Sequence, residues 1–313
     1  MKNTYKYIIK AVAFCASFVL LFLLVQSILT PKFKNESTVR VDGIKRLVSN
    51  EQLDVLFCGS SQMFCSIDAK MLTEKYNIRS YDYGSSYQCL QTTAYYLEEA
   101  LKNCKPKKVY IEVGNIHITS LDLTDRALTW NYSPMEPNIN KFKSVYSVTG
   151  DIVKSAEHTC FPLLLYHSRW NEIHSEDISY YFSYFQDDTY ANRGYLTKDK
   201  ITSVVLEYLN PDNDIFTIQE ENKNAIDNIS KLCKDNGIEI YFFKVPAPFW
   251  KQSQSRAVKS FMKEKGLRFI DYSDYLSEFG LDGNNDFQDK VHLNKYGAKK
   301  FTSFFVEKMI GAL

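Results

Sequence analysis

Short apolar runs alternate with amphipathic segments over most of the chain, and this alternation constrains the fold most strongly. Val55–Cys58 is wholly apolar and stops at Gly59, as expected for a buried strand followed by a sharp turn. The segments between the runs carry apolar residues at helical spacing. Strands that alternate with helices predict an α/β fold, a parallel sheet with helices on both faces. The predicted strands are Val55–Cys58, Ile78–Tyr83, Lys108–Val113, Ile238–Val245 and Leu267–Asp271, and the predicted helices are Ser66–Tyr76, Tyr87–Asn103, Ile218–Asp235, Ser255–Lys265 and Lys295–Ile310.

An uncharged apolar segment, Ala11–Leu29, precedes this pattern. At ~1.5 Å per residue, a helix of this length spans most of the hydrocarbon core of a membrane. No small-residue cleavage site follows it, which favours an uncleaved signal anchor over a removed signal peptide. We therefore predict a transmembrane helix at 11–29 after a short N-terminus at 1–10, a tether at 30–44, and one domain at 45–313.

Composition excludes some classes of function. The chain has 38 basic and 37 acidic residues and a net charge of +1, which argues against a nucleic-acid-binding surface. Its seven cysteines follow no metal-binding spacing and are predicted to be small buried hydrophobes, with a Cys89–Cys104 disulfide as the less favoured alternative. The high aromatic content, 15%, suits carbohydrate stacking and ordinary core packing alike.

Two distant motifs predict nucleophilic serine chemistry. Ser60 and Ser61 follow the first strand, where a hydroxyl projects into the ligand crevice of an open α/β sheet. Near the C-terminus, Asp289 lies three residues before His292, so that one tight turn can bring the two side chains together. A serine nucleophile needs an imidazole as base and a carboxylate to hold the imidazole tautomer. Asp286 is a competing acid, but it lies six residues before the histidine and is predicted to be a loop or capping residue.

These motifs, GSS near the start and DxxHLNxxG near the end, resemble those of the SGNH (GDSL-type) hydrolase superfamily. Among its members, the chain looks most like membrane-anchored cell-envelope proteins, the teichoic-acid D-alanylation protein D and alginate-acetylation types. The resemblance implies a flavodoxin-like three-layer αβα sandwich with strand order 2-1-3-4-5. It also implies Ser61 as nucleophile, with Ser60 standing where the family often has Asp, His292 as base and Asp289 as acid.

The resemblance further implies an oxyanion hole made by Ser61, Gly84 and Asn115. The family pattern Gly-x-Asn-Asp is broken here, because Gly114 and Asn115 are adjacent. About a hundred residues, 116–217, separate the third and fourth strands, which is long for a crossover. We expect this insertion to form a lid whose Arg169 and Trp170 face an anionic or sugar-like substrate.

The resulting hypothesis is a membrane-anchored serine esterase or O-acyltransferase that acts on acyl esters of a cell-surface polysaccharide or related envelope polymer. No metal or organic cofactor is needed. The resemblance favours an N-terminus inside and a domain outside the membrane, and it implies a multi-pass membrane acyltransferase as a partner. The alternative is a non-catalytic accessory protein that uses the same fold to bind polymer.

Overall fold

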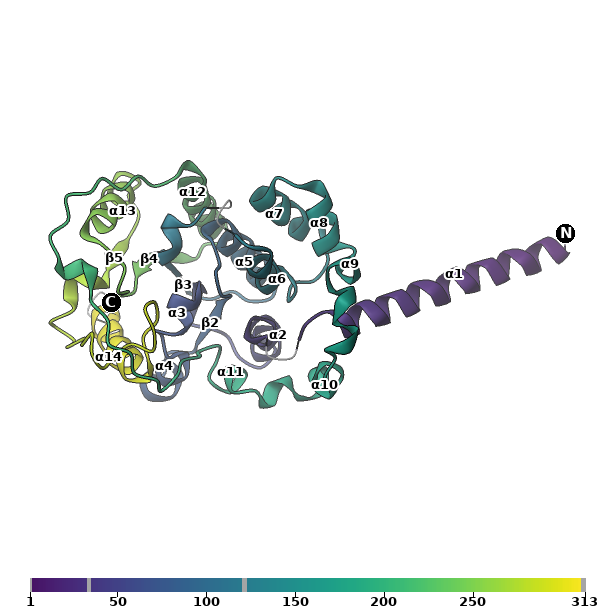
Figure 1. Cartoon of the computed structure of the whole chain (residues 1–313), viewed down its shortest axis with the longest axis horizontal. Coiled ribbons are helices and arrows are strands. Elements are labelled where there is room, and N and C mark those ends of the chain that lie inside the picture. The colour runs from purple at the N-terminus through teal and green to yellow at the C-terminus, as the bar shows by residue number, and fades with distance from the viewer. Residues whose placement is uncertain (1, 33–34, 120–122, 311–313) are drawn as a thin grey trace.

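A five-stranded parallel sheet forms the centre of the domain in the computed structural model, which describes residues 2–32, 35–119 and 123–310 (Figure 1). The strand order is β2-β1-β3-β4-β5, and every pairing is parallel. The predicted α/β class and strand order are therefore confirmed. The strands are β1 (Val55–Gly59), β2 (Ser80–Gly84), β3 (Lys108–Glu112), β4 (Glu239–Lys244) and β5 (Phe269–Asp271).

Helices cover both faces of the sheet, which explains why the interior strand β1 is apolar throughout. Leu56 and Cys58 face one hydrophobic core, and Val55 and Phe57 face the other, because successive side chains of a strand point to opposite faces. The first core is completed by α2 (Glu36–Val48), α5 (Leu90–Leu101), α12 (Glu220–Asp235) and α13 (Gln252–Glu264), and the second by α4 (Ala69–Tyr76) and α14 (Lys295–Ile310). All seven cysteines are free, and five of them are buried.

The N-terminal helix α1 (Lys2–Leu29) projects away from the domain (Figure 1). Within its segment Thr4–Leu29, a window of 18 residues has a mean hydropathy of 2.7, and the segment is long and apolar enough to cross a membrane. The predicted tether at 30–44 is wrong, because α2 begins at Glu36 and belongs to the domain. Its Arg40 and Val41 are fully buried, and its N-cap Asn35 accepts a hydrogen bond from the N–H of Ser37 at 3.2 Å.

The insertion between β3 and β4 is largely helical and packs beside α5 (Figure 1). It runs past the edge strand β2 before the chain returns to α12. Its main helices are α6 (Asp125–Tyr132), α7 (Ile139–Thr149), α8 (Ile152–Thr159), α9 (Pro162–Tyr166), α10 (Ser175–Ser183) and α11 (Asp188–Ala191), and a 3-10 segment, η3 (His167–Asn171), joins α9 to α10.

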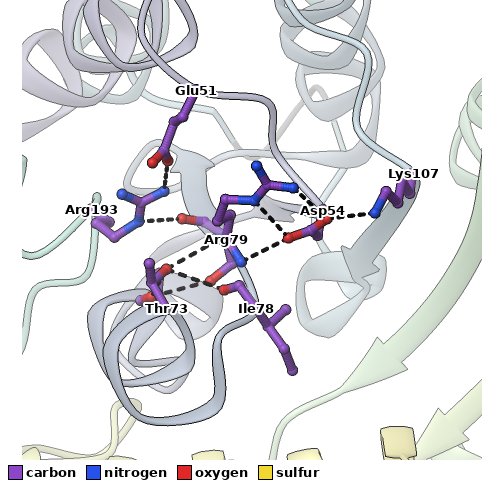
Figure 2. A network of polar contacts seen from close by, with 9 residues as sticks. Glu51, Asp54, Thr73, Ile78, Arg79, Lys107 and Arg193 are labelled. Carbon is purple, nitrogen blue, oxygen red and sulfur yellow. Dashed lines mark hydrogen bonds and ion pairs between the residues drawn. The ribbon is translucent and has the colours of Figure 1, made fainter.

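A polar network ties the end of this insertion to the amino ends of β1, β2 and β3 (Figure 2). Asp54 receives two side-chain hydrogen bonds from Arg79, at 3.0 and 3.1 Å, and forms an ion pair with Lys107 at 2.8 Å. The Arg79 guanidinium lowers the pKa of Asp54 below its usual range, so this carboxylate stays charged. Arg193 from the insertion pairs with Glu51 and donates to the first carbonyl of β2 at 2.7 Å. This network lies at the amino ends of the strands, and the carboxyl ends of the strands, on the opposite side, carry the candidate site.

Candidate active site

Ser61 lies beyond the carboxyl end of the interior strand β1, as the first residue of the short helix α3 (Ser61–Phe64). Ser60 caps this helix, because its Oγ accepts a hydrogen bond from the N–H of Gln62 at 3.3 Å. The two serines therefore differ: Ser60 is buried and its hydroxyl is used in the cap, whereas Ser61 lines a cavity. A Cβ at Gly59 would lie 2.9 Å from the Cβ of Glu112, so the turn that presents Ser61 requires a glycine there.

The loop before α14 brings an imidazole and a carboxylate to Ser61. His292 Nε2 lies 2.8 Å from Ser61 Oγ, and His292 Nδ1 lies 3.0 Å from both carboxylate oxygens of Asp289. Asp289 Oδ1 also accepts the N–H groups of Val291 and His292, each at 2.8 Å, so the tight turn orients the carboxylate as well as the ring. Burial alone would raise the pKa of Asp289, but the hydrogen bonds and charge supplied by His292 lower it below the ordinary value, and the group is ionised at neutral pH.

Asp286 holds the loop from the other side. Its carboxylate is almost fully buried and accepts the N–H of Asp282 and the Nζ of Lys300, both at 2.7 Å. Asn294 caps α14 by accepting the N–H of Tyr296 at 3.0 Å, as its position in the sequence suggests. Asp289 thus faces the imidazole, and Asp286 fixes the turn.

The cavity in front of Ser61 has a volume of about 520 Å³, and its lining residues are spread along the chain from Glu36 to His292. The insertion contributes Trp130 and the segment 196–198, so part of it does cover the site. Tyr87 stands opposite, with its ring 6.3 Å from that of Trp130 and a positive φ of 56°, a conformation that is costly for a bulky residue. The other lining side chains include Glu36, Ser86, His117, Phe249, Asp289 and Val291.

A buried chain of hydrogen bonds fixes Asn115, which also lines the cavity. Gln62 Nε2 donates to Asn115 Oδ1 at 3.2 Å, and Asn115 Nδ2 donates to the carbonyl of Gln88 at 2.9 Å. Lys244 in turn donates to Gln62 Oε1 at 2.9 Å and to the carbonyl of Val245. The amide orientation of Asn115 therefore depends on a lysine at the end of β4.

Lys244 is paired beneath the site with Glu112, 3.7 Å from Nζ to Oε1, and neither side chain is exposed. Burial lowers the pKa of Lys244 and raises that of Glu112, and the attraction between the two charges opposes both effects. Glu112 Oε1 also accepts the N–H of Gly114 at 2.7 Å. A Cβ at Gly114 would lie 2.5 Å from both Gln62 Oε1 and Glu112 Oε1, which explains the glycine beside Asn115.

Three predicted site residues lie outside this cavity. Gly84 packs beneath the Ser61 turn, where a Cβ would lie 2.1 Å from the carbonyl oxygen of Gly59, and the cavity begins two residues later. Arg169 donates to the carbonyl of Leu29 at 2.5 Å and is paired with the buried carboxylate of Asp177. Its guanidinium therefore binds the end of α1 and not the cavity. Trp170 is 73% exposed at the same place. The expectation that Arg169 and Trp170 face the substrate is therefore corrected: Trp130 and residues 196–198 supply that wall.

Sequence reasoning missed Gln62, Lys244, Glu112, Glu36 and Trp130. One signal was available for two of them, because Glu112 and Lys244 are charged residues at the carboxyl ends of the otherwise apolar runs VYIE and IYFFK. Buried charges of this kind are retained only when they are paired. Within the ranges that the structure describes, no three His, Cys, Asp or Glu side chains gather as they would around a metal ion.

No family model matches the sequence, and no curated protein matches it either. Among solved structures, the fold is similar to that of a protein from Bacteroides fragilis described as a "putative acylhydrolase". The two are 13% identical with a TM-score of 0.41, and the alignment covers 85% of this chain and 94% of the other. A likeness at this level defines neither the family nor the activity of the chain.

Proposed function

We propose that the chain is a membrane-anchored serine esterase or O-acyltransferase that acts on acyl esters of a cell-surface polysaccharide or related envelope polymer. The observation that carries this proposal is the continuous contact from Ser61 Oγ through His292 to Asp289, at 2.8 and 3.0 Å. These distances fall within the range required for proton transfer from a hydroxyl nucleophile to its base.

In the proposed reaction, Ser61 Oγ attacks the acyl carbonyl while its proton passes to His292 Nε2. Asp289 holds Nδ1 protonated and stabilises the imidazolium. The tetrahedral intermediate then expels the alcohol, which takes the proton from His292, and an acyl-serine remains. Water or a sugar hydroxyl attacks that ester by the same route in reverse, which gives hydrolysis or acyl transfer respectively.

The negative charge on the intermediate needs hydrogen-bond donors near Ser61. The Ser61 N–H is suited to this, since the first N–H groups of a helix have no partner within it. Asn115 Nδ2 carries two hydrogens and donates to one carbonyl, which leaves a second hydrogen for the oxyanion. The contribution of Gly84 stays a prediction.

The walls of the cavity support a sugar-bearing substrate. Tyr87, Trp130 and Phe249 offer flat aromatic faces, and Glu36 and Ser86 offer polar groups that are hydrogen-bonded to each other at 3.2 Å. The insertion and the C-terminal loop both line the cavity, and its mixture of aromatic and polar side chains suits a polysaccharide better than a long apolar acyl group. The membrane anchor, the outward orientation of the domain and a multi-pass acyltransferase partner remain proposals of the same kind.

Labelling by a fluorophosphonate probe tests the proposal directly. The full chain in detergent should be labelled covalently, and Ser61→Ala should abolish the label. Ser60→Ala is the matched control, because it changes a neighbouring serine of the same turn and should retain labelling. Failure of the correctly folded wild-type protein to react would favour the non-catalytic polymer-binding alternative. A panel of acetyl, alanyl and longer-chain esters would then define the acyl group.

A further inference from the structure

The insertion wraps around the C-terminal turn of α1. We call residues 161–183, which include α9, η3 and α10, the collar. Arg169 of the collar donates to the carbonyl of Leu29 at 2.5 Å and to Asp177 Oδ2 at 3.0 Å, and Asp177 Oδ1 accepts the N–H of Lys32 at 3.2 Å. A backbone N–H of α9 also donates to the side chain of Gln26 at 3.4 Å. The domain is thus joined to the end of α1 by direct contacts at Gln26, Leu29 and Lys32, which restrict its orientation.

The collar exposes several large apolar side chains among its polar ones. On α10, Asp177 and Tyr180 are buried, whereas Ile178 and Phe182, one helical turn apart, are exposed, Phe182 by 81%. Trp170 is exposed by 73%. Further exposed apolar side chains of the collar are Phe161, Leu164, Ile173 and Tyr181. Singly exposed hydrophobic residues are ordinary, but a contiguous apolar surface marks an interaction site.

The length of α1 places this surface relative to a membrane. Burial against the domain becomes continuous near Gln26, and the side chains of residues 4–21 are exposed. The stretch from residue 4 to residue 25 measures about 33 Å at ~1.5 Å per residue, which matches a hydrocarbon core of about 30 Å. If α1 spans the bilayer as proposed above, the collar lies where the helix leaves the hydrocarbon. Figure 1 shows α9 and α10 at this junction.

We infer that the collar is a membrane-interface seat: Trp170, Phe182 and their apolar neighbours insert into the boundary between headgroups and acyl chains. Aromatic side chains favour this depth because one part is apolar and another polar. The occupant is the lipid itself, since the collar directly contacts the last turn of the helix that the lipid would surround. The seat holds the domain at a fixed height and tilt over the bilayer.

The charges of the collar indicate how it binds. It contains one arginine, already paired, against three acidic residues, Glu172, Glu176 and Asp177. An electrostatic attraction to anionic headgroups needs basic residues, so the seat depends on apolar insertion. Its contact with lipid is expected to be the same in zwitterionic and anionic membranes and to be independent of salt.

Fluorescence quenching by brominated lipids tests the inference on the full chain. The protein is reconstituted into phosphatidylcholine vesicles whose acyl chains are brominated near the carbonyl end. The chain has three tryptophans, so the signal of Trp170 is the difference between wild type and Trp170→Phe. We expect this difference signal to be quenched by the brominated lipid, to be shielded from aqueous acrylamide, and to be unchanged by added phosphatidylglycerol, salt or a lower protein-to-lipid ratio.

Ile215 provides the matched control. It is 94% exposed, and its neighbour Asp214 pairs with Lys251 beside α13, at the end of the domain remote from α1 (Figure 1). A tryptophan introduced by Ile215→Trp in the Trp170→Phe background should be quenched by acrylamide and not by the brominated lipid. Retention of both proteins in the vesicles after carbonate extraction reports the insertion of α1 separately. A carbonate-resistant protein whose Trp170 is quenched by acrylamide alone would overturn the seat while leaving the anchor intact. Quenching that disappears on dilution into excess lipid would also overturn it, in favour of a contact between copies.

Discussion

Lys244 offers the sharpest test of how the site is organised, because it lies two hydrogen bonds away from the proposed oxyanion donor. It contacts Gln62, which contacts Asn115, and it balances the buried charge of Glu112. The variant Lys244→Met keeps an unbranched side chain that is one atom shorter and removes both the charge and the donors. We expect it to affect stability and turnover through separate routes.

The stability effect follows from the charge left behind. Removing one member of a buried ion pair typically costs about 3–5 kcal/mol. The lower end is expected here, since the pair is 3.7 Å apart and Glu112 keeps the N–H of Gly114. Burial raises the pKa of Glu112, and without Lys244 the pKa rises further. A carboxyl whose folded-state pKa is raised loses stability as pH rises above its unfolded value of about 4.3. The variant should therefore be more destabilised at pH 8 than at pH 5.

The rate effect follows from the lost orientation. Deleting an oxyanion donor outright costs about 10²–10³ in kcat, and this is the effect expected for Asn115→Ala. Lys244→Met leaves Asn115 in place but frees the Gln62 amide that orients it, so a decrease of about tenfold in kcat with little change in KM is expected. The assay is ester turnover by the full chain in detergent, with unfolding followed by circular dichroism.

The double variant Lys244→Met/Glu112→Gln separates the two routes. The glutamine carries no charge, and its oxygen can still accept the Gly114 N–H, so stability should recover. The rate should not recover, because Gln62 still lacks its donor. Recovery of both stability and kcat would refute the positioning argument and leave the pair with a role in folding alone.

Three further predictions concern single residues. Ser61→Ala should lower turnover by several orders of magnitude, whereas Ser60→Ala, which removes a cap, should cost about 1 kcal/mol of stability and far less rate; the reverse ranking would make Ser60 the nucleophile. Asp289→Asn should keep the fold and lower kcat by about 10⁴, whereas Asp286→Asn should lower the Tm and change kcat by a few-fold, and equal effects on kcat would contradict the assignment. Burial lowers the pKa of Lys141 to about 7, so between this pH and about pH 10.4 folding releases a proton and the stability rises with pH. Lys141→Met should therefore raise the Tm more at pH 6 than at pH 9. A pH-independent change in Tm would exclude a buried neutral lysine.

The sheet could be predicted because its signal is local. Most strands are short runs of mainly apolar residues, although the edge strand β2 contains the buried Asp82. The order of the strands came from the family resemblance rather than from the pattern. The tether was wrong for an equally physical reason. Arg40 interrupts the apolar pattern of α2 and marks it as a surface segment, yet its Nε donates to the carbonyl of Gly194 at 2.7 Å and its guanidinium lies 3.4 Å from the centre of the Phe64 ring. Partners that distant in sequence leave no local signal.

The same difference, between local signals and contacts of residues distant in sequence, decides which parts of the site could be predicted. Asp289 and His292 are three residues apart, so one turn determines their contact, and a serine at a strand end needs only the sheet to place it. The connection from Lys244 to Gln62 spans 182 residues and depends on the register of β4 beside β3. Arg169 was assigned to a substrate because the insertion was expected to cover the serine as a lid, with this cation facing an anionic or sugar-like group. Its partner is instead a carbonyl at the end of α1, a group that no motif reports.

The positions of the collar and the cleft are linked through α2. Glu36 lines the cleft and lies seven residues after Leu29, so the two are at most about 25 Å apart even for a fully extended chain. Because α2 is packed against β2 and Arg169 of the collar is hydrogen-bonded to Leu29, both ends of this connection are held by contacts with the domain. If the collar is seated in the bilayer, the cleft is therefore held within a short distance of the membrane surface and at one orientation to it. A flexible tether would let the domain sample distant polymer, whereas this connection restricts the proposed enzyme to esters presented close to the membrane.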